Sequence, residues 1–173
     1  MSGGAGTVLV IGYGNPGRQD DGLGPALADA LAERGIPGLT VESDYQLTVE
    51  DAADVAACDV VVFADACVCG PEPFTFRPVE GKRAVSFSSH SIAPEAVLAL
   101  AHDLFGAATR GYVLGVRGYR FDEFDERLSE RARANLGQAL RFLDVLLRDE
   151  AFRSPGPGPA GLEERCSHSR QER

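Results

Sequence analysis

Hydrophobic and polar residues alternate along this chain in two distinct patterns. Short apolar runs such as Val8–Ile11, bounded by glycine or polar residues, are typical of strands buried in a sheet. They predict strands at Thr7–Ile11, Leu39–Ser43, Asp59–Ala64, Arg83–Phe87 and Gly111–Val116, with Phe74–Pro78 as a short edge strand. Between these runs, apolar residues return at helical spacing and predict helices at Gly22–Arg34, Val49–Ala56, Pro94–Phe105 and Leu128–Leu147.

The order of these elements predicts the fold class. The first predicted helix carries Leu23, Leu27 and Leu31 on one stripe, and Pro94 stands where proline favours the first turn of a helix. Strands that alternate with helices indicate a mainly parallel sheet covered on both faces. We therefore expect an α/β fold: a three-layer α/β/α sandwich around a mainly parallel, roughly five-stranded twisted sheet.

Size and charge narrow the possible partners. With 173 residues, 44% of them hydrophobic and 25% charged, the chain has the composition of one globular domain. Its net charge of −9 disfavours nucleic acid and anionic membrane surfaces as partners. No apolar run reaches the ~18 residues of a membrane span, and no coiled-coil repeat is present. We expect no membrane or nucleic-acid partner, and a monomer.

The two ends of the chain carry little information on function. The first residues lack the basic and apolar regions of a signal peptide, so the cytoplasm is the expected compartment, and the 4 cysteines are expected to be reduced. A Pro/Gly-rich stretch begins at Ser154, which predicts a single domain over residues 1–153 and a disordered polar tail over 154–173. Cys166 and His168 in this tail are too few to define a metal site.

The segment after the first predicted strand contains a nucleotide-binding pattern. Gly12, Gly14 and Gly17 spell the G-x-G-x-x-G sequence of dinucleotide-binding folds. Glu42 or Asp44 stands near the end of the second predicted strand, where such folds place an acid that binds the ribose. A Rossmann-like dinucleotide-binding protein is therefore one interpretation of the chain.

Other residues of the same segment disfavour that interpretation. Pro16 removes a backbone donor where a pyrophosphate needs donors. Asp20 and Asp21 follow at the predicted start of a helix, where carboxylates stabilise the helix but repel a phosphate. Adjacent residues at a helix start point in different directions. We therefore expect one of the two acids to face a cleft and the other to cap the helix or support the turn.

Three polar residues are expected to meet at one edge of the sheet. Asp21 follows the first predicted strand, Asp65 closes the third, and His90 follows the fourth. The carboxyl ends of parallel strands share an edge, and two carboxylates with one imidazole suit nickel, zinc or a similar divalent ion. Taken singly, Asp21 is explained as a helix-start acid, Asp65 as an acceptor for loop backbone, and His90 as a hydrogen-bonded loop histidine. Their meeting at one rim favours a functional site.

The motifs around these residues resemble those of the hydrogenase maturation endopeptidases, which trim the C-terminal extension from the nickel-containing large subunit of [NiFe] hydrogenases. In chain order, the matches are the G-x-G-N-P-x-x-x-D-D-G-x-G pattern of Gly12–Gly24, Tyr45–Leu47 with Glu50, Val60–Ala66, and Ser88–His90 before the helix at Pro94. The resemblance spans residues 7–147, nearly all of the predicted domain.

The resemblance implies a nickel-dependent peptidase whose substrate is the large-subunit precursor of a [NiFe] hydrogenase. Its pattern assigns metal recognition and catalysis to Asp21, Asp65 and His90, and selects Asp21 over Asp20. The nickel is expected to be carried by the precursor and not held permanently by this protein. A non-cleaving assembly factor that binds nickel or the precursor would use the same residues, so this alternative stays open.

Three further residues near the expected rim have more than one interpretation. Gln46 matches the Gln-Leu pair of the family, and serves either as a substrate contact or supporting hydrogen bond, or in plain loop packing. Cys67 and Cys69 follow Asp65 closely and are expected to be small packing residues, because a structural zinc site needs a second pair of ligands; a soft-metal or redox role is the alternative.

Overall fold

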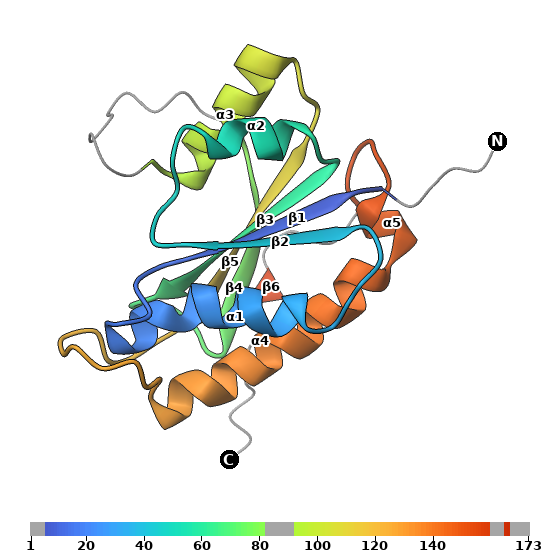
Figure 1. Ribbon diagram of the computed structural model, residues 1–173. Helices are drawn as coiled ribbons and strands as arrows, with labels where there is room; N and C mark the ends of the chain where they lie inside the picture. Colours follow the sequence, from blue (N-terminus) through green and yellow to red (C-terminus); the bar gives the residue numbers. More distant parts are fainter. Residues whose placement is uncertain (1–5, 82–91, 160–164, 167–173) are drawn as a thin grey trace.

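A computed structural model describes residues 6–81, 92–159 and 165–166. Within these residues, one six-stranded sheet runs in the order β2-β1-β3-β5-β4-β6 (Figure 1). The strands are β1 (Val8–Tyr13), β2 (Leu39–Asp44), β3 (Val60–Cys67), β4 (Phe74–Val79), β5 (Arg110–Arg117) and β6 (Arg165–Cys166). The helices are the 3₁₀ helix η1 (Gln19–Gly22), α1 (Leu23–Ala32), α2 (Asp51–Ala56), α3 (Pro94–Phe105), α4 (Glu130–Arg148) and α5 (Glu150–Arg153).

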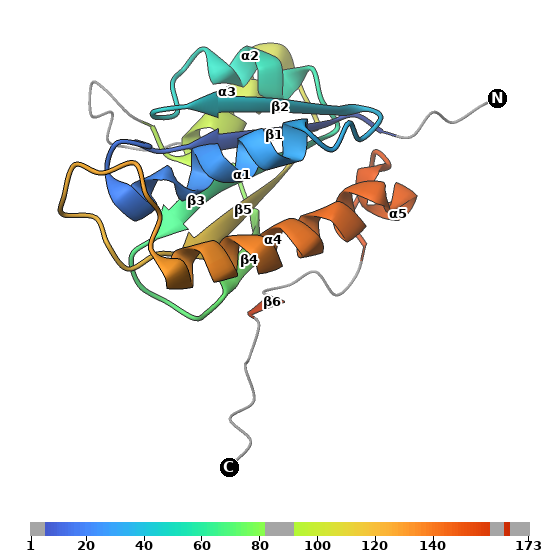
Figure 2. The ribbon, with the colours of Figure 1, turned by 60° about the horizontal axis from the view of Figure 1, so that its bottom comes forward.

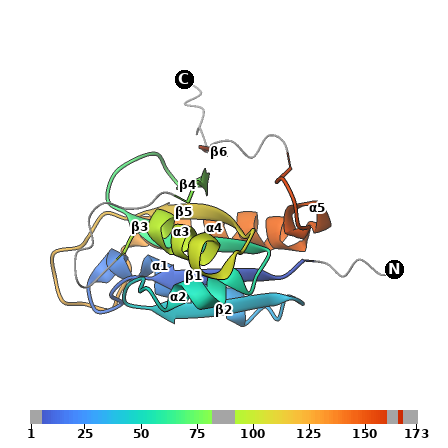
Figure 3. The same cartoon turned by 90° about the horizontal axis from the view of Figure 1, so that it is seen from above.

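The sheet is mainly parallel and covered on both faces, as the sequence predicts. β1 pairs in parallel with β2 and β3, and β3 pairs in parallel with β5. β4 and β6 are antiparallel additions at one edge. Helices α1 and α4 lie side by side on one face (Figure 2), and α2 and α3 cover the other (Figure 3). The prediction of an α/β/α sandwich is confirmed.

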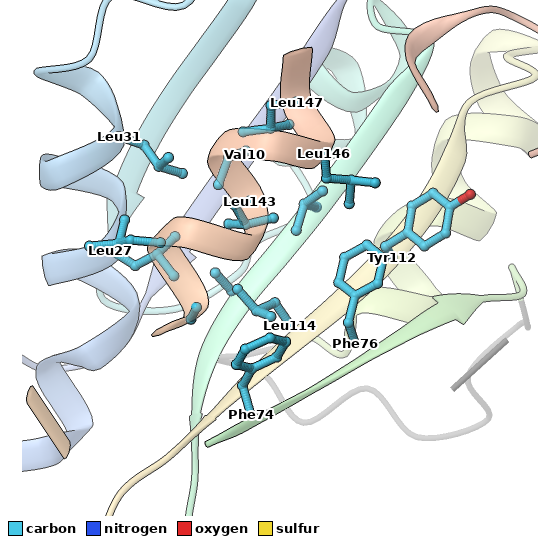
Figure 4. Close-up of a cluster of buried hydrophobic side chains, with 14 of the residues drawn as sticks. Val10, Leu27, Leu31, Phe74, Phe76, Tyr112, Leu114, Leu143, Leu146 and Leu147 are labelled. Atoms are coloured by element: carbon cyan, nitrogen blue, oxygen red, sulfur yellow. The ribbon is translucent and has the colours of Figure 1, made fainter. Parts of the chain in front are cut away.

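Two apolar cores hold the layers together. Alternate residues of β1 enter different cores: Val8 and Val10 face α1 and α4, whereas Leu9 and Ile11 face α2 and α3. A strand buried on both sides needs apolar residues at every position, which explains why β1 lacks a polar alternation. Figure 4 shows the first core, where leucines of α1 and α4 meet β1, β4 and β5. The labelled side chains are Val10, Leu27, Leu31, Phe74, Phe76, Tyr112, Leu114, Leu143, Leu146 and Leu147.

Some predicted boundaries differ from the observed ones. The third strand continues through Asp65 to Cys67, because β5 pairs with it up to Arg117. The first helix is preceded by η1, so its α-helical part begins at Leu23. The predicted strand Arg83–Phe87 lies outside the described residues. Of the predicted disordered tail, the structure describes residues 154–159 and β6, and the disorder itself stays a prediction.

Glycines in the G-x-G-rich segment allow a helix to start directly against the sheet. A Cβ atom on Gly12 would lie 2.1 Å from the carbonyl oxygen of Gly24, and one on Gly24 would lie 2.2 Å from the carbonyl oxygen of Tyr13. At such short distances there is no room for a side chain, so both positions require glycine. The close contact fixes η1 and the start of α1 at the carboxyl ends of β1 and β3, where the predicted site residues stand.

None of the helices in the described part of the chain combines the length and the apolar character that crossing a membrane requires.

Candidate active site

The glycine-rich turn after β1 is closed by its own hydrogen bonds. The Asn15 N–H donates to Asp21 Oδ2 at 2.9 Å, and the Gly17 N–H donates to Asn15 Oδ1 at 2.9 Å. The Gly14 N–H donates to the carbonyl oxygen of Asp44 at 3.0 Å. In dinucleotide-binding folds, such N–H groups face the pyrophosphate. Here they are engaged within the chain, which disfavours the nucleotide interpretation of the glycine pattern.

Asp20 is fully buried and supports a distant loop. Its carboxylate accepts the N–H groups of Tyr119 at 2.8 Å and Arg120 at 3.0 Å. The N–H and the hydroxyl of Ser129 donate to it as well, each at 2.7 Å. Burial alone would raise the pKa of Asp20, but the donors from Ser129, Tyr119 and Arg120 outweigh it and lower the pKa below its usual value. Asp20 therefore ties η1 to the loop over residues 118–129.

Asp21 and Asp65 meet at the carboxyl edge of the sheet. Asp21 is half-buried, and its negative charge raises the pKa of the Asp65 carboxyl. Burial of Asp65 is the larger cause; together they outweigh hydrogen bonds from the Ala66 N–H and the Tyr13 hydroxyl, and bring the pKa of Asp65 to about 6. A carboxyl with such a pKa exchanges protons near neutral pH.

Tyr13 completes this group, and sequence reasoning missed it. It is the last residue of β1, and strand alternation places it on the same face as Leu9 and Ile11. Its hydroxyl is hydrogen-bonded to Asp65, and burial, followed by the charge of Asp65, raises its pKa. The protonated hydroxyl of Tyr13 donates a hydrogen bond to the Asp65 carboxylate. Strand alternation gives the face of the sheet on which Tyr13 lies, but not its contact with Asp65.

An ion pair lies on the same face of the sheet. Arg77 Nη2 of β4 lies 3.3 Å from Glu95 Oε1 in the first turn of α3. The charge of Glu95 raises the pKa of Tyr13, and that of Arg77 lowers it. Both charges therefore lie close enough to Tyr13 to change its pKa, one from β4 and the other from α3.

The third predicted ligand, His90, lies outside the described residues. Within residues 6–81 and 92–159, no group of three His, Cys, Asp or Glu side chains is arranged to hold a metal ion. Asp21 and Asp65 place two carboxylates at the rim, and two carboxylates hold a hard or borderline divalent ion only when other ligands complete the set. Gln46 is exposed on the loop after β2, whereas the adjacent Leu47 is buried in the second core.

The two cysteines after Asp65 differ from each other in burial. Cys67 is half-buried on β3, two positions after Asp65 and therefore on the same face of the strand. Its thiol contacts the carbonyl oxygen of Cys69. Cys69 is exposed, so the expectation that both cysteines are packing residues is wrong for Cys69, which lies where the chain has left the sheet.

The fold and this rim define the class of the molecule: a three-layer α/β protein with paired carboxylates at the carboxyl edge of its sheet. Solved structures of similar fold include [NiFe] hydrogenase maturation proteases. The protease HycI of Thermococcus kodakarensis KOD1 matches with a TM-score of 0.66 and 22% identity, over 86% of this chain and 96% of that chain. The hydrogenase maturating endopeptidase HybD of E. coli matches with a TM-score of 0.60 and 23% identity, over 82% and 92%.

A third structure, the hydrogenase 2 maturation peptidase of Thaumarchaeota archaeon SCGC_AB-539-E09, matches with a TM-score of 0.59 and 22% identity, over 79% of this chain and 95% of that chain. No family model and no curated protein sequence matches the chain. At this level of identity the similarity shows a shared fold.

Proposed function

We propose that this protein is an endopeptidase that removes the C-terminal extension from the nickel-loaded large-subunit precursor of a [NiFe] hydrogenase. One observation carries the proposal: Asp21 and Asp65 come together at the carboxyl edge of a fold that solved maturation proteases share. The motif resemblance over residues 7–147 supports it independently.

In the proposed reaction, Asp65 is the general base. Water adds to the carbonyl carbon of the scissile peptide bond while the Asp65 carboxylate accepts a proton from that water. The carbon–nitrogen bond then breaks, and the same proton passes to the leaving amine, so that a carboxyl group and an amine result. A base with a pKa of about 6 is ionised at neutral pH yet basic enough for this transfer. The Tyr13 hydroxyl orients Asp65 by its hydrogen bond.

Nickel enters the proposal as part of the substrate. Carboxylate oxygens and imidazole nitrogens are ligands that nickel accepts, so Asp21, Asp65 and His90 are proposed to contact the nickel when the precursor docks, and Asp65 then leaves the metal to act as the base. This contact docks the scissile bond at the rim, where the metal either polarises the carbonyl or acts in recognition alone. An ion delivered by the substrate needs only a partial set of ligands on the enzyme.

Intact-mass analysis of a co-produced large-subunit precursor tests the proposal. We expect loss of a C-terminal peptide only when both this protein and nickel are present. Asp21→Ala and Asp65→Asn should prevent the mass change, whereas Asp29→Asn, which alters an exposed acid on α1, should not. A stable complex with an unchanged precursor mass would overturn the peptidase and favour a non-cleaving assembly factor. Cleavage without nickel would show that the reaction does not require the metal.

A further inference from the structure

A pocket of about 580 Å³ lies between η1, the loop over residues 118–129 and the start of α4. In Figure 2 this loop precedes α4 and extends past the start of α1. The charged lining residues are Arg120, Asp125, Arg127, Glu130 and Arg133, and Gln19 lies in the lining as well. A second pocket of about 390 Å³ shares Gln19 and Arg120 with the first. Arg120 therefore lines both pockets, which adjoin each other.

The lining of this pocket carries a net positive charge, whereas the adjoining pocket is lined by Asp122 and Glu123 as well as Arg120. The chain as a whole has a net charge of −9, but in this lining three arginines outnumber two acids by one. The start of α4 adds to the positive potential, since the N-terminal end of a helix carries a partial positive charge. A site of this kind attracts a group with a single negative charge, whereas a strongly charged anion is repelled by the acidic body of the protein.

Two of the three arginines are available to a ligand. Arg127 Nη2 is engaged by Asp125 Oδ2 at 2.7 Å. Among the residues that the structure describes, no carboxylate pairs with Arg120 or Arg133. A guanidinium group presents planar donors that match the two oxygens of a carboxylate. The chemistry of this pocket therefore fits a carboxylate ligand.

The backbone around the pocket is fixed before any ligand binds. Asp20 holds Arg120 and Ser129 through their N–H groups. The Gln19 N–H donates to the carbonyl oxygen of Asp125 at 2.7 Å, and Gln19 itself is buried in a left-handed conformation with a φ of 52°. Rigid walls reduce the entropy lost on binding. They also connect the pocket to η1, which contains Asp21.

We propose that this pocket binds a carboxylate side chain of an acidic segment in the protein substrate, beside the segment that enters the active site. The inference rests on the proposed function, because it assigns the ligand to the same substrate. Phe124, which directly precedes Asp125 in the chain, is 92% exposed and offers an aromatic surface to the same segment. Arginine and aromatic residues are enriched where proteins bind one another.

Nuclear magnetic resonance titration tests the pocket with defined probes. The first probe is a capped peptide with one glutamate among glycine and serine residues, the second is its glutamine counterpart, and the third is inorganic phosphate. We expect the glutamate peptide to shift the Arg120, Ser129 and Arg133 signals, and the glutamine peptide to bind at least fivefold more weakly. Arg120→Gln and Arg133→Gln should weaken binding at least fivefold. Arg141→Gln, on an exposed position of the same helix, should not.

Two results would overturn the proposal: equal binding of the glutamate and glutamine peptides, or binding of phosphate at lower concentration than the glutamate peptide. Asp65→Asn should bind the glutamate peptide like the wild type, because it leaves the pocket intact. In the precursor assay, Arg120→Gln should raise KM at least threefold with a smaller effect on kcat. If the wild type cleaves no precursor, the proposed function fails, and the titration still decides whether the pocket binds carboxylates.

Discussion

Asp20 is a fully buried carboxylate and Asp65 a half-buried one at the same rim, and they differ in the donors around them. Asp20 receives four hydrogen bonds from Tyr119, Arg120 and Ser129, and its pKa is lowered. Asp65 accepts bonds from Ala66 and Tyr13 beside the negative charge of Asp21, and its pKa rises to about 6. Burial acts in the same direction on both. The donors decide that one carboxylate is a permanent charge and the other a proton acceptor.

The comparison explains how neighbouring acids in one turn serve different purposes. Asp20 has a structural role, because its carboxylate accepts backbone N–H groups from a distant loop. Asp21 accepts one N–H from Asn15 and faces Asp65.

The largest effect is expected from Asp65→Asn. An amide cannot accept the proton in the proposed reaction, so precursor processing should fall by about 10²–10⁴-fold, the usual contribution of a general base. Rates of precursor cleavage at pH 7.5 measure it, with Asp29→Asn as the control. Retention of more than a tenth of the wild-type rate would show that Asp65 is not the base.

Asp20→Asn should damage stability. The amide presents an NH₂ group to donors that need an acceptor, so the free energy of unfolding should fall by about 3 kcal/mol. Urea denaturation followed by circular dichroism measures it. Asp122→Asn, an exposed position of the same loop, should change stability by less than ~0.5 kcal/mol. Equal stability of the two variants would mean that Asp20 is not the anchor of this loop.

The two carboxylates should give stability curves of opposite slope with pH. The pKa of Asp65 is higher in the folded protein than the ~4 of an unfolded chain, so its folded form gains protons and stability should fall as pH rises from about 4 to 6. Above pH 6 the wild type should be about 2 kcal/mol less stable relative to Asp65→Asn than it is at pH 4. The pKa of Asp20 is lowered, so its contribution is present above about pH 4 and is lost as pH falls below that value.

Denaturation of the wild type, Asp65→Asn and Asp20→Asn between pH 3 and 8 separates these slopes. A constant difference between the wild type and Asp65→Asn across that range would contradict the raised pKa of Asp65.

The smallest effect is expected from Tyr13→Phe. The Tyr13 hydrogen bond lowers the pKa of Asp65, so its removal should raise that pKa further and move the acid limb of the pH–rate profile to higher pH. We expect a loss of about threefold in rate at pH 6 and little change at pH 8. Tyr45→Phe, at an exposed tyrosine, is the matched control. A loss that is the same at both pH values would indicate that Tyr13 acts by packing alone.

The sequence predicts the layers of this molecule well because its signals are local. Apolar runs and helical stripes define β1, β3, β5 and the four longer helices, and the Pro94–Phe105 helix has the predicted bounds. The approach of Asp21 to Asp65 follows from parallel topology, whereas their roles, and that of His90, stay predictions. Cytoplasmic location and a monomeric state also stay predictions.

The parts that sequence reasoning missed depend on contacts between distant residues. The partners of Asp20 lie 99 to 109 positions further along the chain, and no local sequence pattern predicts these contacts. The arginine pocket requires η1, a loop and the first turn of α4 to be placed together. From the sequence, Tyr13 looks like any other residue at the end of a buried strand. Only the structure shows that its hydroxyl is hydrogen-bonded to Asp65.

The anchoring of the loop at Asp20 has a consequence for how such proteins can diversify. Three of its four donors are backbone N–H groups, which any residue except proline supplies, and the fourth is the Ser129 hydroxyl. All of them stand at the two ends of the loop. The side chains of residues 121–128 are therefore not part of this anchor, and their exchange gives a new surface toward a partner while the Asp20 bonds stay in place, provided that the new loop keeps the Asp125 backbone bonds to Gly17 and Gln19.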